Sequence, residues 1–367
     1  MNNTYSNTKA TLAIAKASFR SIIRSPSAVV FSLAFPLIFI LVFGFIGGGS
    51  GVKVDVSVMN GSDTLSPVYK ALQNSPIVHL IKNQDTALIK TNLEKGRLAA
   101  TILIQKNINH LPPYTVAVQY TKASEANGNI FRSVVMGILS AINKPTAAVP
   151  APSVVNLHES TITGRVYRTI DFILPGQLGF SLLSSGVFGT AFVFLSLRVQ
   201  LVIKRFFATP VKRYSIVLGE MIARIIFSLL GALFIILIGH FAFNFTLVHG
   251  ITTVLNMLVL SVIGLIVFMG FGFVVSGIAK NESSVPPIAN IITLPQFLLS
   301  GTFFSINAFP SWLQPISKAL PLTHLNQAMR DVAFEGATLF DVKNEIGIML
   351  IWMVIIYTVA VKTFKWE

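Results

Sequence analysis

The chain has 367 residues and a net charge of +14, and 53% of its residues are hydrophobic while only 11% are charged. A soluble domain carries about 25% charged residues, so this composition excludes an ordinary soluble protein and predicts an integral membrane protein. Cysteine is absent, which excludes a disulfide framework, a cysteine-ligated metal and thiol chemistry. Nine of the 28 Lys and Arg residues lie in two segments without any acidic residue, which favours membrane-flanking segments over a nucleic-acid partner.

Residues 1–27 are predicted to form a cytoplasmic amphipathic helix that lies in the plane of the lipid headgroups. Its positive residues are seven, four and four positions apart and share one side of a helix; they are Lys9, Lys16, Arg20 and Arg24. The alternative is the charged region of a signal peptide. The following apolar run, 28–46, has 19 residues and no small-x-small cleavage site, which favours an uncleaved transmembrane helix 1.

The segment 47–170 is predicted to be an extracytoplasmic mixed α/β domain. It opens with a glycine cluster that lacks the Gly-Lys-Ser/Thr of a phosphate-binding loop, and no such loop occurs elsewhere in the chain. Residue patterns and capping residues predict strands at 54–58, 77–81, 98–104 and 115–120, and helices at 65–72, 86–95 and 124–142. A Pro/Ala-rich run at 147–152 indicates a linker. The segment 47–170 contains three histidines that lack the spacing of metal ligands: His79, His110 and His158.

The segment 171–367 is predicted to carry transmembrane helices 2–6, because it contains five further apolar runs of about the length that crosses a bilayer. The runs cover roughly 172–197, 216–243, 254–279, 285–304 and 346–364. A Pro-broken segment, 305–325, indicates an outer re-entrant element anchored by Trp312. We therefore predict a membrane all-α bundle of six transmembrane helices, with an amphipathic N-terminal interfacial helix and a small extracytoplasmic α/β domain between helices 1 and 2.

The loop 198–215 is predicted to be a cytoplasmic surface that another protein contacts. It lies between two apolar runs and carries no acidic residue, and positive loops of this kind are retained in the cytoplasm. Thr209-Pro210 separates its two basic parts. The candidate coupling residues are Arg198, Lys204, Arg205, Thr209, Pro210, Lys212 and Arg213. Because Lys362 and Lys365 lie at the end of the last apolar run, both termini are expected in the cytoplasm.

Glu220 and Arg224 are four residues apart near the cytoplasmic start of the third apolar run, a spacing that allows them to pair on a helix. Two interpretations stay open: a structural ion pair at a helix end, or a relay of movement from the loop. A proton-coupled carrier is disfavoured, since the predicted transmembrane helices lack a chain of acidic or histidine residues. No nucleophile–base set, catalytic residue or metal-ligand set is indicated, which disfavours an intramembrane enzyme.

Three stretches resemble the type-2 permease family of ATP-binding-cassette transporters, exporter type. The first, 203–219, contains Ala-Thr-Pro-Val and is similar to that family's first cytoplasmic loop. The second, 294–304, reads Leu-Pro-Gln-Phe-Leu-Leu-Ser-Gly-Thr-Phe-Phe, and the third covers 310–324 and 328–330. The matching positions are Pro295, Ser300, Gly301, Pro310, Trp312, Pro321 and Arg330. Where the family often has Glu-Arg-Glu-x-Gly-Thr, residues 198–203 contain no acid, so no particular ion pair to an ATPase is carried over.

The resemblance implies the permease subunit of an ATP-driven transporter that exports a drug, lipid or other amphiphile. It implies that this chain binds no cofactor, and that ATP and Mg²⁺ are held by a separate cytoplasmic ATPase subunit. It further implies a homodimer, or a heterodimer with a related permease, in the bilayer of a bacterial cytoplasmic (inner) membrane. The alternative is a membrane-anchored receptor or assembly protein that uses its extracytoplasmic domain as a binding module.

Overall fold

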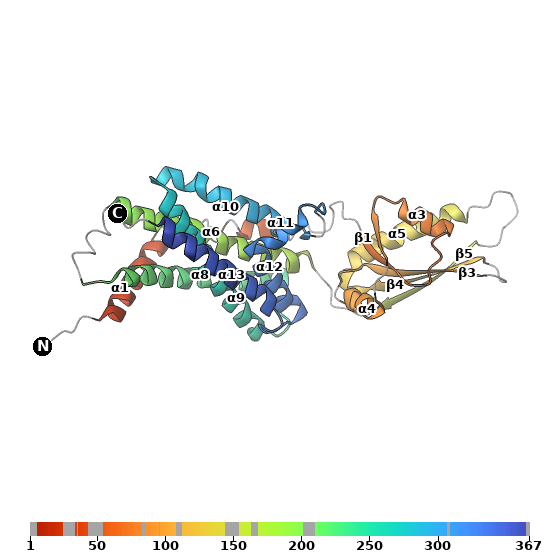
Figure 1. Cartoon of the computed structure of the whole chain (residues 1–367). Helices are drawn as coiled ribbons and strands as arrows, with labels where there is room; N and C mark the ends of the chain where they lie inside the picture. The colour runs from red at the N-terminus through yellow and green to blue at the C-terminus, as the bar shows by residue number, and fades with distance from the viewer. Residues whose placement is uncertain are drawn as a thin grey trace. The chain divides into compact units, whose positions relative to one another are not determined.

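The computed structural model describes residues 6–24, 34, 36–42, 54–82, 85–94, 96–107, 112–143, 154–162, 168–200, 210–306 and 309–364. The chain forms two compact units (Figure 1). We call residues 1–46 together with 169–367 the membrane unit, and residues 47–168 the α/β unit.

The membrane unit is helical, and four of its described helices are long and apolar enough to cross a bilayer. These four are α6 (Thr169–Val199), α8 (Arg213–Phe243), α9 (Ile251–Ile278) and α13 (Lys343–Thr363). Within an apolar stretch of 18 residues in each helix, 72% of the stretch in α9 is buried inside the protein, against 17% of that in α13. The central helix is therefore α9, and α13 presents most of its surface outward. The shorter helices are α1 (Asn7–Ile23), α10 (Val285–Leu299), α11 (Gln314–Ala319) and α12 (Pro321–Arg330).

Transmembrane helices 2, 3, 4 and 6 of the sequence prediction correspond to α6, α8, α9 and α13. Predicted helix 1, at 28–46, lies mostly outside the described residues. Helix 5 was expected over 285–304, but α10 ends at Leu299 and has only 15 residues. Its C-cap is Ser300, and the next residue, Gly301, has a φ of +72°, a left-handed conformation that ends a helix. The expected length was therefore wrong, because the Ser-Gly pair ends the helix inside the apolar run.

Close packing between α6 and α9 depends on glycines. A Cβ atom on Gly272 would lie 2.8 Å from the carbonyl oxygen of Gly186, and a Cβ on Gly186 would lie 2.7 Å from the Cβ of Phe268. Neither position tolerates a side chain without separation of the two helices. Small residues allow such close backbone approach inside membranes, where the hydrophobic effect does not drive helices together. These glycines serve internal packing of the membrane unit.

The α/β unit contains a five-stranded sheet in the order β2-β1-β3-β4-β5. The strands are β1 (Val54–Val58), β2 (Val78–Ile81), β3 (Ala100–Lys106), β4 (Tyr114–Thr121) and β5 (Val155–Ile162). Strand β1 is parallel to β2 and β3, β3 is antiparallel to β4, and β4 is parallel to β5. Helices α3 (Pro67–Gln73) and α5 (Glu125–Ile142) cover one face of the sheet, and α4 (Thr86–Glu94) packs in a separate small apolar cluster (Figure 1).

Strands at β1 to β4 and helices at α3, α4 and α5 confirm the sequence prediction, with ends shifted by a few residues. The fifth strand, β5, was missed. Its sequence, Val-Asn-Leu-His-Glu-Ser-Thr-Ile, buries only Val155 fully and lacks an alternating pattern. An edge strand has one neighbour and needs little apolar surface, so it forms through tertiary pairing that residue patterns do not report.

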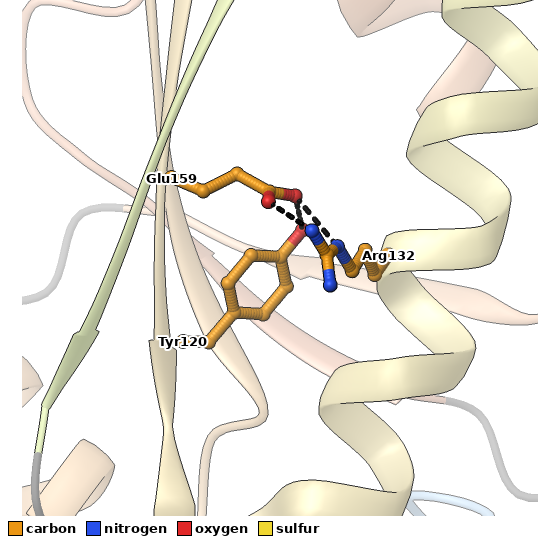
Figure 2. A network of polar contacts seen from close by, with 3 residues as sticks. All are labelled: Tyr120, Arg132 and Glu159. Carbon is orange, nitrogen blue, oxygen red and sulfur yellow. Dashed lines mark hydrogen bonds and ion pairs between the residues drawn. The ribbon is translucent and has the colours of Figure 1, made fainter.

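A polar network holds β5 to the rest of the α/β unit (Figure 2). Arg132 on α5 donates to both carboxylate oxygens of Glu159 on β5, at 3.0 and 2.6 Å. The Tyr120 hydroxyl on β4 donates to Glu159 at 3.3 Å. Burial, and then the nearby Glu159 carboxylate, raise the pKa of the Tyr120 phenol above its ordinary value, so the phenol keeps the proton that it donates.

Candidate functional site

The N-terminal amphipathic helix α1 packs against the first half of α8. It begins at Asn7, where the Ser6 hydroxyl caps it, and it buries Thr11, Ala15 and Ile22. The contact requires Gly219 on α8, because a Cβ atom there would lie 2.7 Å from the Ile14 side chain and 3.0 Å from the Thr11 carbonyl oxygen. Helix α1 therefore packs closely against α8, a helix of transmembrane length in the same chain.

A hydrogen bond connects α1 to α8 beside this contact. The Ser18 hydroxyl on α1 donates to the Glu220 carboxylate, next to Gly219. Ser18 lies about two turns after Thr11, on the side of α1 that faces α8. A displacement of α1 along or away from α8 would therefore break a directional bond as well as an apolar contact.

One turn further along α8, Arg224 reaches the opposite neighbour. Its guanidinium donates to the carbonyl oxygen of Gly189 at 2.9 Å and to that of Ser185 at 3.4 Å, both on α6. Arg224 is only 8% exposed. Gly189 makes room for it, since a Cβ there would lie 1.7 Å from an Arg224 nitrogen. The Ser185 and Ser228 hydroxyls lie 2.8 Å apart and join the same two helices.

These contacts add to the pairing expected between Glu220 and Arg224, whose opposite charges attract one turn apart on α8. Because α8 lies between α1 and α6, each side chain also binds the helix on its own side. Ser18 supplies a donor to the carboxylate, and the backbone beside Gly189 supplies acceptors to the guanidinium. The two residues therefore connect three helices. Sequence reasoning missed Ser18 and Ser185, and the small residues of α1 and α6 were the only signal for them.

Several residues of the loop 198–215 lie where helices of the membrane unit end. Arg198, in the last turn of α6, donates to the carbonyl oxygen of Ala279 at 2.5 Å, which ties α6 to the end of α9. The turn after α9 is stiff, because Asn281 and Ser284 form a reciprocal capping box. Pro210 and Lys212 precede α8 and are exposed, Arg213 begins it, and the Lys212 ammonium lies 5.9 Å from the Tyr214 ring centroid. Lys204, Arg205 and Thr209 lie outside the described residues.

Lys16, Arg20 and Arg24 point away from α8 and are exposed. Together with Phe19 and Ile23 they line an open pocket along α1. The same helix thus presents a small-residue side to α8 and a positive side to its surroundings.

A second cluster gathers several of the positions that resemble family motifs. The Arg330 guanidinium donates to the Gly301 carbonyl oxygen at 2.6 Å and to the Phe172 carbonyl oxygen at 3.0 and 3.1 Å, and it lies 3.7 Å from the centroid of the Phe172 ring. Asn326, one turn earlier on α12, donates to the Ser300 carbonyl oxygen at 3.3 Å. Arg330, Ser300 and Gly301 therefore form one junction, which fastens the start of α6 to the ends of α10 and α12.

The other motif positions have separate places. Pro295 lies inside α10, and Pro321 begins α12. Pro310 accepts a hydrogen bond from the Leu313 backbone, and Trp312 is 70% exposed. Asn326 and Phe172 complete the junction but were not identified from the sequence. The four-residue spacing of Asn326 and Arg330 was the available signal, because it places both side chains on one side of a helix.

The described helices define a multi-pass membrane protein. Residues 26–362 match the family described as ABC-2 family transporter protein, and the chain belongs to that family. This confirms the resemblance to permeases of ATP-binding-cassette transporters.

Similar proteins include "ABC transporter G family member 20" of Dictyostelium discoideum, which is 24% identical over 95% of this chain and 50% of its own length. The chain therefore spans half the length of that relative. "Linearmycin resistance permease protein LnrN" of Bacillus subtilis is 20% identical over 97% of this chain and 100% of its own length. "Probable multidrug ABC transporter permease YbhS" of Escherichia coli K12 is 19% identical over 92% of this chain and 91% of its own length.

Proposed function

We propose that this chain is the permease subunit of an ATP-driven exporter whose cargo is a drug, lipid or other amphiphile. The observation that carries the proposal is the full-length match to a linearmycin resistance permease, supported by the match to a probable multidrug permease over nearly its whole length. On this proposal a separate cytoplasmic ATPase subunit binds ATP and Mg²⁺. The pathway is completed by a second copy of the chain or by a related permease.

The proposed topology places both termini in the cytoplasm of a bacterial cell and the α/β unit outside its cytoplasmic membrane. Support comes from the positive residues of α1 and of the loop 198–215, which positive-inside retention keeps on the cytoplasmic side. The proposed segments are 1–27 for the cytoplasmic helix, 28–46 for the first transmembrane helix, 47–170 for the outer domain and 171–367 for the remaining bundle, with 305–325 at the outer face.

The proposed mechanism is a push by the ATPase on α1 and on the loop 198–215. A force on α1 reaches α8 through the Gly219 contact and the Ser18–Glu220 hydrogen bond. It continues to α6 through Arg224 and to α9 through Arg198. Each step is a direct contact between two helices, so a movement of α1 has a continuous physical route into the bundle.

The test is co-expression with a candidate ATPase subunit, chosen from any ATPase gene that adjoins the gene of this chain, followed by purification and reconstitution in nanodiscs. We expect the two subunits to purify together, and we expect ATP hydrolysis to rise when the cargo is present in a panel of amphiphilic drugs and lipids. If the α/β unit binds ligands while no ATPase associates with the chain, the receptor or assembly function replaces the transporter function.

A further inference from the structure

Helix α1 has three distinct sides, which its residue spacing and burial define. One side is buried against α8 and contains Thr11, Ala15 and Ile22. The next side is apolar yet open: Leu12 is 59% exposed and Ile23 is 50% exposed. The third side carries Lys16, Arg20 and Arg24, each four residues from the next and all exposed.

The positive side and the apolar side meet in the pocket along α1. Its lining combines three cations with two apolar side chains, Phe19 and Ile23. Among the described residues, none of the three cations takes part in a salt bridge. The first acidic residue of the sequence is Asp55, which belongs to the α/β unit, so no acid within α1 offsets this charge.

The side of α8 that receives α1 continues beyond it as an open apolar surface. Gly219 contacts α1, and the residues seven, eleven and eighteen positions later fall on the same side of the helix. These are Ile226, Leu230 and Leu237, which are 44%, 53% and 39% exposed. These residues leave an apolar surface on α8 beyond its contact with α1.

We propose that Lys16, Arg20 and Arg24 form a binding site for the phosphate of an anionic phospholipid, with Phe19 and Ile23 against the start of its acyl chains. Helix α1 is packed on a helix of membrane-spanning length, and its exposed apolar residues adjoin the cations. A surface that combines cations with exposed apolar residues suits the boundary between headgroups and acyl chains. An ATPase that covered this side would leave Leu12 and Ile23 in water, so the ATPase contact of the proposed mechanism falls on the remaining surface of α1 and on the loop 198–215.

The experiment is native mass spectrometry of the purified full-length chain, incubated with phosphatidylglycerol or phosphatidylcholine of the same acyl chains. We expect phosphatidylglycerol to bind preferentially. The triple variant K16Q/R20Q/R24Q should lose this binding by roughly a hundredfold, since each basic residue near an anionic lipid surface contributes about a fivefold to tenfold factor. The matched control K280Q/K318Q/K343Q removes three exposed cations elsewhere in the membrane unit and should bind as the wild type does.

Two further arms separate the sources of phosphate and test the apolar contact. Inorganic phosphate should not displace the bound lipid, and Ile23→Ser, which keeps every cation, should weaken lipid binding several-fold. Equal retention of both lipids, displacement by inorganic phosphate, or unchanged binding in the triple variant would overturn the proposal. So would a triple variant that keeps phosphatidylglycerol but loses the ATPase, because the cations would then belong to a protein contact. The lipid-binding result does not depend on the transport function.

Discussion

At the scale of single residues, the contact between Arg224 and Gly189 leaves little room for a side chain at position 189. A buried guanidinium is stabilised only when its donors have acceptors, and here two backbone carbonyls of α6 supply them. The absence of a side chain at Gly189 leaves the space that the guanidinium occupies.

We expect Gly189→Ala to destabilise the protein strongly. The added Cβ would lie 1.7 Å from the guanidinium and would force Arg224 away from its acceptors. Leaving a buried charge without partners costs about 3–5 kcal/mol. The matched control is Gly347→Ala on α13, where a Cβ meets no atom within 4 Å and where alanine favours the helix. Thermal unfolding of the detergent-purified chain measures the difference, and equal melting temperatures for the two variants would contradict this assignment.

Ser18 gives a second test at the residue scale. Ser18→Ala removes the donor to Glu220 but keeps the small side chain that α1 needs against α8. A hydrogen bond contributes about 1 kcal/mol, so we expect the cargo transported per ATP hydrolysed to fall roughly fivefold, with folding intact. Ser21→Ala changes an exposed serine of the same helix and should have no effect. Equal coupling in both alanine variants would remove Ser18 from the proposed route.

At the scale of elements, the strand β5 depends on its polar network with α5 and β4. Arg132→Gln removes the bidentate bond to Glu159 and leaves only the Tyr120 contact. Because the Arg132 side chain is 54% exposed, we expect a modest loss of at most about 1 kcal/mol, concentrated in β5. Hydrogen exchange of residues 155–162 should accelerate, whereas Lys70→Gln on the exposed side of α3 should leave it unchanged. An unaltered exchange rate in Arg132→Gln would show that strand pairing alone holds β5.

The elements that the sequence predicts well are those whose residue pattern alone determines them. The long apolar runs of α6, α8, α9 and α13 are visible in composition, and so are the alternating residues of β1. The misses have a tertiary cause. Strand β5 forms by pairing with β4, α10 ends where Gly301 adopts a left-handed conformation, and Glu220 and Arg224 bind different neighbours because α8 lies between two helices. For the same reason, the motif positions were visible in the sequence, but their convergence at Arg330 was not.

At the scale of the whole molecule, the contacts of α1, α8, α6 and α9 form one connected route through the membrane unit. It begins at Ser18 and ends at Ala279, next to the stiff turn at 280–284. A continuous route of this kind suits the mechanism proposed above, in which a partner subunit pushes on α1. The positive loop 198–215 lies between the ends of α6 and α8 in the sequence, where such a partner would act on both helices together.

The most direct test of this account is ATP-driven transport in proteoliposomes by the permease and its ATPase, with the double variant K204E/R205E. Like charges placed against a partner surface cost several kcal/mol, so we expect transport per ATP hydrolysed to fall by at least roughly tenfold while basal hydrolysis persists. The control K90E/K122E reverses two exposed charges in the α/β unit and should transport as the wild type does. Unchanged coupled turnover in K204E/R205E would contradict the account.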